Sequence, residues 1–106
     1  MPRYLFRVSY TSTGAAGLLK EGGSSRVSAV ERLVKSLGGT VEFQYWTLGE
    51  DDYFLVAQLP DNAAAAAASL SVAATGIARV TTSVVLSPED LDEAARRRVE
   101  YRPPGA

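Results

Sequence analysis

The chain has 106 residues, of which 46% are hydrophobic and 22% are charged, and its formal net charge is −1. These values are typical of one compact globular domain, and the balanced charge gives no support for a nucleic-acid or anionic-membrane surface. The chain contains neither His nor Cys, which excludes disulfides, thiolate nucleophiles and metal or haem ligation by those residues. Any chemistry must use carboxylates, hydroxyl groups, Lys, Arg or the backbone.

The first residues carry no continuous apolar run, because Arg3 and Arg7 interrupt it. No secretory signal is therefore expected. No segment reaches the ~18–20 apolar residues that a membrane span needs. A chain without cysteine is also consistent with a reducing compartment, so we expect a cytoplasmic location.

Residues 3–10 alternate between aromatic or aliphatic and more polar side chains. This period of two predicts a strand. The next segment, residues 11–25, contains four glycines. We expect it to form a long, partly ordered connection with at most one short turn of helix, and connections of this length are often functional.

A helix is predicted to begin at Ser24 or Ser25, since a serine hydroxyl can accept an unpaired amide of the first turn. Its apolar residues recur at spacings of three and four, which is typical of a helix with one buried face. That stripe consists of Val27, Val30, Leu33, Val34 and Leu37. The pair Gly38-Gly39 should end the helix.

The second half of the chain repeats this pattern. Strands are predicted over residues 40–48, 52–59 and 77–86, and a helix capped by Asp61 over residues 62–74. Pro60 should end the strand before that helix.

A short terminal helix is predicted over Pro88–Arg98, because Ser87 can cap it and acidic residues fill its first turn. Its arginines complement the helix C-terminus. We expect one domain over residues 1–98 and a flexible tail over residues 99–106.

The predicted order is β-α-β-β-α-β followed by a helix. This is the α+β, ferredoxin-like plan, with a four-stranded antiparallel sheet and its helices on one face. Strict alternation assigns side chains to the buried face as follows: Tyr4, Phe6 and Val8; Val41, Phe43 and Tyr45; Leu55, Ala57 and Leu59; Val80, Val84 and Leu86.

The other face of the sheet should combine large apolar residues with charged ones. These are Leu5, Trp46, Phe54, Val56 and Val85 together with Arg7, Glu42, Gln44, Gln58 and Arg79. Contiguous exposed apolar patches usually mark interfaces. We therefore expect a symmetric homodimer in which two sheets pack face to face, through Leu5, Arg7, Glu42, Trp46, Phe54, Val56 and Arg79.

The residues Thr47-Leu48-Gly49, Asp52 and Pro60-Asp61 resemble the GYD domain family, which is named for a glycine–tyrosine–aspartate motif at this hairpin. Tyr10-Thr11 and Gly38-Gly39 are also similar to that family, and the resemblance spans about residues 4–86. Gly49 and Asp52 match the motif, with Glu50 in a variable slot. Asp51 stands where the motif has tyrosine, so no role of that tyrosine transfers to this chain.

The resemblance implies a dimeric α/β-barrel plan. Proteins of that plan include cofactor-free monooxygenases, small-molecule isomerases and haem-degrading enzymes. No general activity is established for the GYD family, so the resemblance implies the fold more than the function. No cofactor is expected for this chain, which lacks a phosphate-loop pattern.

The predicted topology brings three connections to one end of the sheet: residues 11–25, the hairpin at 49–52 and the turn at 75–76. We expect a pocket there, with Tyr10, Tyr45 and Trp46 as its walls and Gly49, Asp51 and Lys20 as further binding residues. Asp52 is the candidate catalytic base or anchor, because a carboxylate beside aromatic rings can have a raised pKa.

The alternative interpretation of the same hairpin is a solvated tight turn without a functional role. Gly49 would then adopt a positive φ, and the acidic residues would favour solubility and turn formation. A metal site is not expected, since neighbouring strand residues point to opposite faces. Three functions stay open: a small-molecule-binding or accessory protein, a cofactor-independent enzyme acting on an aromatic or polyketide-like compound, and a structural or regulatory interaction module.

Overall fold

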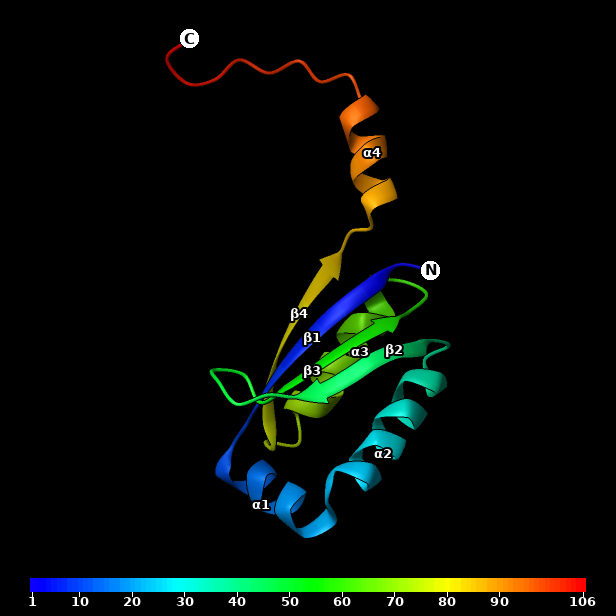
Figure 1. Cartoon of the computed structure of the whole chain (residues 1–106), viewed down its shortest axis with the longest axis vertical. Helices are drawn as coiled ribbons and strands as arrows, with labels where there is room; N and C mark the ends of the chain where they lie inside the picture. The colour runs from blue at the N-terminus through cyan, green and yellow to red at the C-terminus, as the bar shows by residue number, and fades with distance from the viewer.

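The computed structural model describes residues 1–106 and has the predicted α+β plan, with one additional helix. Its elements are β1 (Arg3–Tyr10), α1 (Ser12–Glu21), α2 (Gly23–Ser36), β2 (Thr40–Trp46), β3 (Tyr53–Gln58), α3 (Asn62–Ala73), β4 (Ala78–Val85) and α4 (Pro88–Arg96). The four strands form one antiparallel sheet in the order β2-β3-β1-β4. Helices α2 and α3 lie on one face of it (Figure 1), which confirms the ferredoxin-like arrangement.

The core lies between this sheet face and the two helices. The alternating residues Tyr4, Phe6 and Val8 of β1 are buried, as alternation predicts. On the helix side, Val34 of α2 and Ala65 and Ala68 of α3 are buried against them. The alanine-rich sequence of α3 lets that helix lie close to the sheet, since alanine adds only a methyl group beyond the backbone.

Helix α1 corrects the expectation of a partly ordered connection, because Ser12–Glu21 is a regular helix of ten residues. The Thr11 side chain accepts a hydrogen bond from the Gly14 backbone amide (3.2 Å) and so caps it. Helix α2 then begins at Gly23 with no side-chain cap, so the predicted capping role of Ser24 or Ser25 is wrong. Gly38 takes the left-handed conformation (φ 83°) after α2, as predicted for its end.

Strand β2 contains a β-bulge that strict alternation does not anticipate. Val41 pairs with Ala57, but the next register pair joins Phe43 to Val56. Glu42 is therefore an extra residue on this strand, and a bulge of this kind re-aims every side chain that follows. Downstream of it, Tyr45 pairs with Phe54 on the open face and Trp46 pairs with Tyr53 on the helix face.

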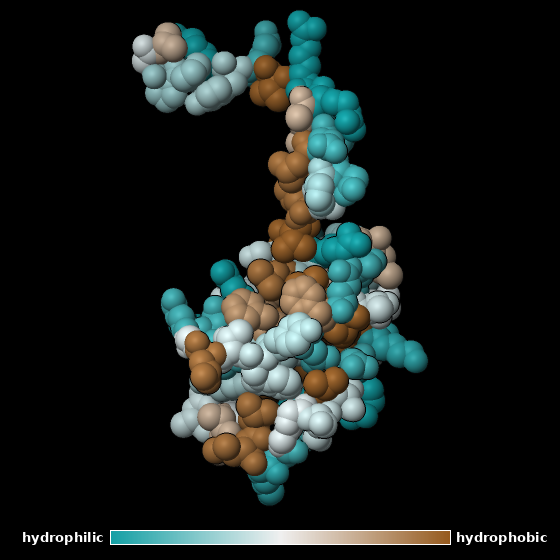
Figure 2. Space-filling view, in the orientation of Figure 1, coloured by the Kyte–Doolittle hydropathy of each residue, from teal (hydrophilic) through white to brown (hydrophobic).

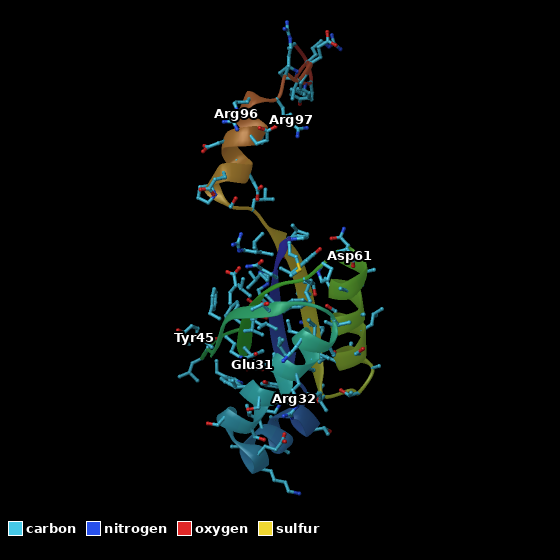
Figure 3. The ribbon with its side chains drawn as sticks, turned by 90° about the vertical axis from the view of Figure 1, so that its right-hand side faces the viewer. Glu31, Arg32, Tyr45, Asp61, Arg96 and Arg97 are labelled. Atoms are coloured by element: carbon cyan, nitrogen blue, oxygen red, sulfur yellow. The ribbon has the colours of Figure 1, made fainter.

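The bulge reverses four predicted assignments. Phe43 and Tyr45 belong to the open face rather than the core, and their side chains are 46% and 66% exposed. Gln44 and Trp46 belong to the helix face, so Trp46 is not a residue of the predicted dimer surface. Figure 3 shows Tyr45 on the side of the sheet opposite α3, and Figure 2 shows apolar side chains gathered on the open face.

The far end of β4 also departs from the prediction. Val84 and Leu86 are predicted to lie on the buried face, but they are 54% and 65% exposed. The strand leads into α4, which projects away from the sheet (Figure 1).

Helix α4 begins with a complete capping box between Ser87 and Asp90, as its sequence predicts. It ends at Arg96 rather than Arg98, and Arg96 and Arg97 both form ion pairs with Glu93. None of its residues is buried. No helix of the chain has the length and apolar character needed to cross a membrane.

The contact between α1 and the body of the domain predicts a clear contrast between two glycines. A Cβ atom on Gly14 would lie 2.0 Å from the carbonyl oxygen of Ile77, whereas one on Gly17 would have no neighbour within 4 Å. We expect Gly14→Ala to lower the free energy of unfolding by about 1–3 kcal/mol, because α1 must shift. Gly17→Ala should raise it by about 0.5–1 kcal/mol.

Urea unfolding followed by circular dichroism would measure both changes. Equal stability of the two variants would contradict the close approach of α1 to Ile77.

Candidate functional site

Three connections meet at the end of the sheet where β1 ends, as the topology predicts. The Thr11 amide donates to the Ile77 carbonyl (2.9 Å), and the Thr11 hydroxyl donates to the Gly76 carbonyl (2.8 Å). On the other side of β1, the Asp52 amide donates to the Val8 carbonyl (2.8 Å). The start of α1 is thus fixed to the α3–β4 turn, and the β2–β3 hairpin is fixed to β1.

The Asp52 side chain continues the β1–β3 ladder past its last residue pair. That pair is Val8 with Tyr53, and the next amide of β1 that points toward β3 belongs to Tyr10. Asp52 Oδ2 accepts a hydrogen bond from this amide at 2.8 Å. The Asp52 carbonyl also accepts from the Thr47 amide (2.9 Å) and closes the hairpin. Asp52 therefore has a clear structural role.

The other candidate residues of the hairpin are less central. Ser9 donates to Asp51 Oδ1 at 3.3 Å, a longer hydrogen bond than the one that Asp52 accepts from the Tyr10 amide. Gly49 is exposed and does not adopt a positive φ, so the prediction that it supplies a left-handed turn is wrong. Lys20 is exposed on α1.

A groove of about 710 Å³ runs between α1 and the β2–β3 hairpin. It is lined by Tyr10, Thr11, Ser12, Ala15, Leu18, Leu19, Gly23, Trp46, Thr47, Leu48 and Asp52. The structure thus brings three predicted site residues together, Tyr10, Trp46 and Asp52. Tyr45, Gly49, Asp51 and Lys20 do not line this groove.

A second, smaller cavity of about 60 Å³ lies between the sheet and helices α2 and α3. Most of its lining is apolar: Phe6, Val8, Val30, Leu33, Val34, Leu55, Ala68, Val72, Ile77, Ala78 and Val80. Tyr10 and Trp46 line both the groove and this cavity. Trp46 Nε1 donates to the Tyr10 hydroxyl at 3.1 Å, so these two side chains form the wall between the two spaces.

The remaining lining residues of the cavity are polar or aromatic: Arg26, Tyr53 and Ser69. The Tyr53 ring lies against Trp46, with ring centroids 4.8 Å apart, and its hydroxyl donates to Gln44 Oε1 (2.5 Å). Burial, and to a lesser degree the nearby Tyr10, raises the pKa of the Tyr53 hydroxyl well above its ordinary value. Tyr53 is therefore a neutral hydrogen-bond donor at physiological pH.

Sequence reasoning missed the cavity residue Tyr53 and its hydrogen-bond partner Gln44, and it did not assign Arg26 to the cavity. No signal in the alternation could reveal Gln44, because the bulge at Glu42 moves it to the helix face. No group of three or more His, Cys, Asp or Glu residues is placed to hold a metal ion.

These features define a small α+β protein with one antiparallel sheet and a groove at the end of its first strand. The model of the GYD domain family matches residues 4–95, and the chain therefore belongs to that family. The match extends into α4 and so beyond the resemblance seen from the sequence. Neither a search of curated proteins nor a search of solved structures gives a match.

The geometry of Asp52 predicts a difference between the two neighbouring aspartates. Asp52→Ala removes the acceptor of the Tyr10 amide, and an unpaired backbone donor costs about 1–3 kcal/mol. Asp51→Ala removes only a long hydrogen bond from Ser9 and should cost less than about 0.5 kcal/mol.

Chemical unfolding of both variants would test this, and Asp52→Asn serves as the control because its amide oxygen can still accept. The structural role would be contradicted if Asp52→Ala were as stable as Asp51→Ala.

Proposed function

We propose that this GYD-family chain is a small-molecule-binding protein whose ligand lies in the groove between α1 and the β2–β3 hairpin. The observation that carries the proposal is the junction of this groove with an apolar cavity at Tyr10 and Trp46. Concave, mainly apolar sites with a few convergent polar groups are typical of ligand binding. The absence of Cys supports a cytoplasmic location as part of the same proposal.

The size of the two spaces indicates how they would share a ligand. The groove, at about 710 Å³, lies within the range of ligand pockets, which is roughly 300–1,000 Å³. The cavity, at about 60 Å³, is too small to hold a ligand by itself. Leu19 and Leu48 are 89% and 106% exposed at the groove, and they offer apolar contact that the isolated chain leaves in water.

A cofactor-independent enzyme is the second candidate, because the Asp52 carboxylate lies on the groove. Its Oδ2 atom accepts the Tyr10 amide hydrogen, which favours anchoring over proton transfer. The substitution Asp52→Asn separates the two functions, since it keeps an acceptor and removes the base. A purely structural or regulatory module is the third candidate, and it requires no ligand in the groove.

We also propose that the chain forms a homodimer through the open face of its sheet. The apolar residues Leu5, Phe54 and Val56 lie on this face by register, and the bulge adds Phe43 and Tyr45 to them. Arg3 and Gln58 both donate to Glu42 Oε1, at 2.5 and 2.8 Å, and lower the pKa of that carboxyl. Arg7 and Arg79 share the face. Val56 is already buried in the single chain, whereas Phe43 and Tyr45 are exposed, and exposed apolar patches usually mark interfaces.

Ligand binding can be tested with four decyl compounds that differ only in their head group: decanol, decanamide, decanoate and decyltrimethylammonium. Trp46 is the only tryptophan, so its fluorescence reports on the groove directly. We expect at least one compound to bind. Ala15→Phe should weaken that binding about tenfold or more, because the ring occupies the groove.

Ala16→Phe is the matched control, since Ala16 is exposed on the same helix and does not line the groove. A result in which no compound binds, or in which both variants bind equally well, would overturn the proposed binding function.

The dimer can be tested by light scattering on the intact chain. We expect a mass near twice the chain mass of 11.3 kDa. Phe43→Glu should shift the mass toward the monomer, because it places a charge among the exposed apolar residues of the open face.

Leu70→Glu is the control, because Leu70 is 68% exposed but belongs to α3, on the other side of the sheet. A wild-type chain that stays monomeric at micromolar concentration would rule out the interface.

A further inference from the structure

The inner cavity contains a single charged side chain. Of its 16 lining residues 14 are hydrophobic, and the other two are Ser69 and Arg26. Arg26 comes from the first turns of α2, and its side chain is 31% exposed, so it stands at the rim of the cavity rather than in open solvent. An arginine at the edge of an apolar space is a natural partner for an anionic group, because the guanidinium matches a carboxylate with two parallel donors.

The hydrogen-bonding capacity of Arg26 is almost unused. Its nearest acid is Glu21, with the closest N–O distance at 3.9 Å, and the guanidinium makes no hydrogen bond within the chain. An arginine carries five N–H donors. Glu21 therefore balances some of the charge of Arg26 and leaves all its donors available to a ligand.

Tyr10 supplies a second available donor near the same place. Its hydroxyl oxygen accepts from Trp46 Nε1, but its own hydrogen donates to no group of the chain. Tyr10 and Arg26 both line the cavity, and both lie close enough to the Tyr53 hydroxyl to shift its pKa, in opposite directions. Tyr10 thus offers an unused donor at the boundary between the groove and the cavity, and Arg26 offers further donors on the cavity side.

We infer that the ligand of this site is an apolar acid, with its carboxylate held by Arg26 and the Tyr10 hydroxyl and its apolar body lying along Leu18, Leu19 and Leu48. This inference rests on the proposed binding function and adds the chemical class of the ligand. The N-terminus of α2 also favours an anionic group here. A Cβ atom built on Gly23 would lie 3.7 Å from the Trp46 ring, and the helix has no side-chain cap.

Besides Glu21, two acidic groups lie near the site: Glu31, whose charge helps to raise the pKa of Tyr53, and Asp52, which fits this orientation. The Asp52 carboxylate lies on the groove, and its Oδ2 atom is already paired with the Tyr10 amide. Asp52 does not line the cavity, whereas Arg26 does. A ligand that placed its acid beside Asp52 would meet a like charge, whereas the rim at Arg26 offers a cation.

The experiment compares decanoate with decanamide, which share a chain length and differ in charge. We expect decanoate to bind about tenfold or more tightly than decanamide by Trp46 fluorescence and calorimetry. Arg26→Gln should remove most of this preference and leave decanamide binding within about twofold. Tyr10→Phe should reduce the preference by a smaller factor, because one donor is lost.

Arg32→Gln is the matched control, since it removes the same charge from an exposed position of α2 that does not line the cavity (Figure 3). It should leave the preference unchanged. Equal binding of decanoate and decanamide, or an equal effect of Arg26→Gln and Arg32→Gln, would overturn the inference and leave the proposed binding function intact. Binding of none of the decyl compounds would overturn both.

Discussion

The β-bulge at Glu42 is the constraint on which both surfaces of this protein depend. One extra residue in an edge strand turns Trp46 toward the helices and turns Phe43 and Tyr45 away from them. Trp46 then meets Tyr10 and forms the wall between groove and cavity. The same bulge places the aromatic rings of Phe43 and Tyr45 on the open face. A β2 strand without the bulge would leave the groove without its tryptophan and would bury two aromatic rings under α2.

The Asp52 hydrogen bond explains how the hairpin keeps its position relative to β1. The pairing of β1 with β3 ends at Val8 and Tyr53, so the next β1 amide that points toward β3, that of Tyr10, has no backbone partner. The Asp52 carboxylate supplies that partner and also fixes the Tyr10 backbone beside the groove. The motif aspartate, which first suggests catalysis, thus extends the hydrogen-bond ladder of the sheet. This contact holds together two residues that line the groove, Tyr10 and Asp52.

Most of the fold follows from local rules that one sequence contains. The alternation in β1, the apolar stripe of α2 and the caps at Asp61 and Ser87 all depend on neighbours within a few residues, and the structure confirms each of them. The faces of β2 could not be predicted, because the bulge depends on pairing with β3. Helix α1 was hidden by Gly14 and Gly17, which lower helix propensity. The sequence also could not assign Arg26, Tyr53 and Gln44 to the candidate site. They come from α2, β3 and β2, and only the packing of these elements brings them together.

Helix α1 is held to the rest of the domain chiefly by its first turn. Thr11 bonds to the α3–β4 turn, and Gly14 admits the Ile77 carbonyl, while the side chains of Ala15, Leu18 and Leu19 face the groove rather than the core. The anchoring residues and the ligand-facing residues of this helix are therefore separate sets. Substitutions in the second set change the shape of the groove without touching the packing of the sheet, so binding specificity in this architecture can diverge at little cost to folding.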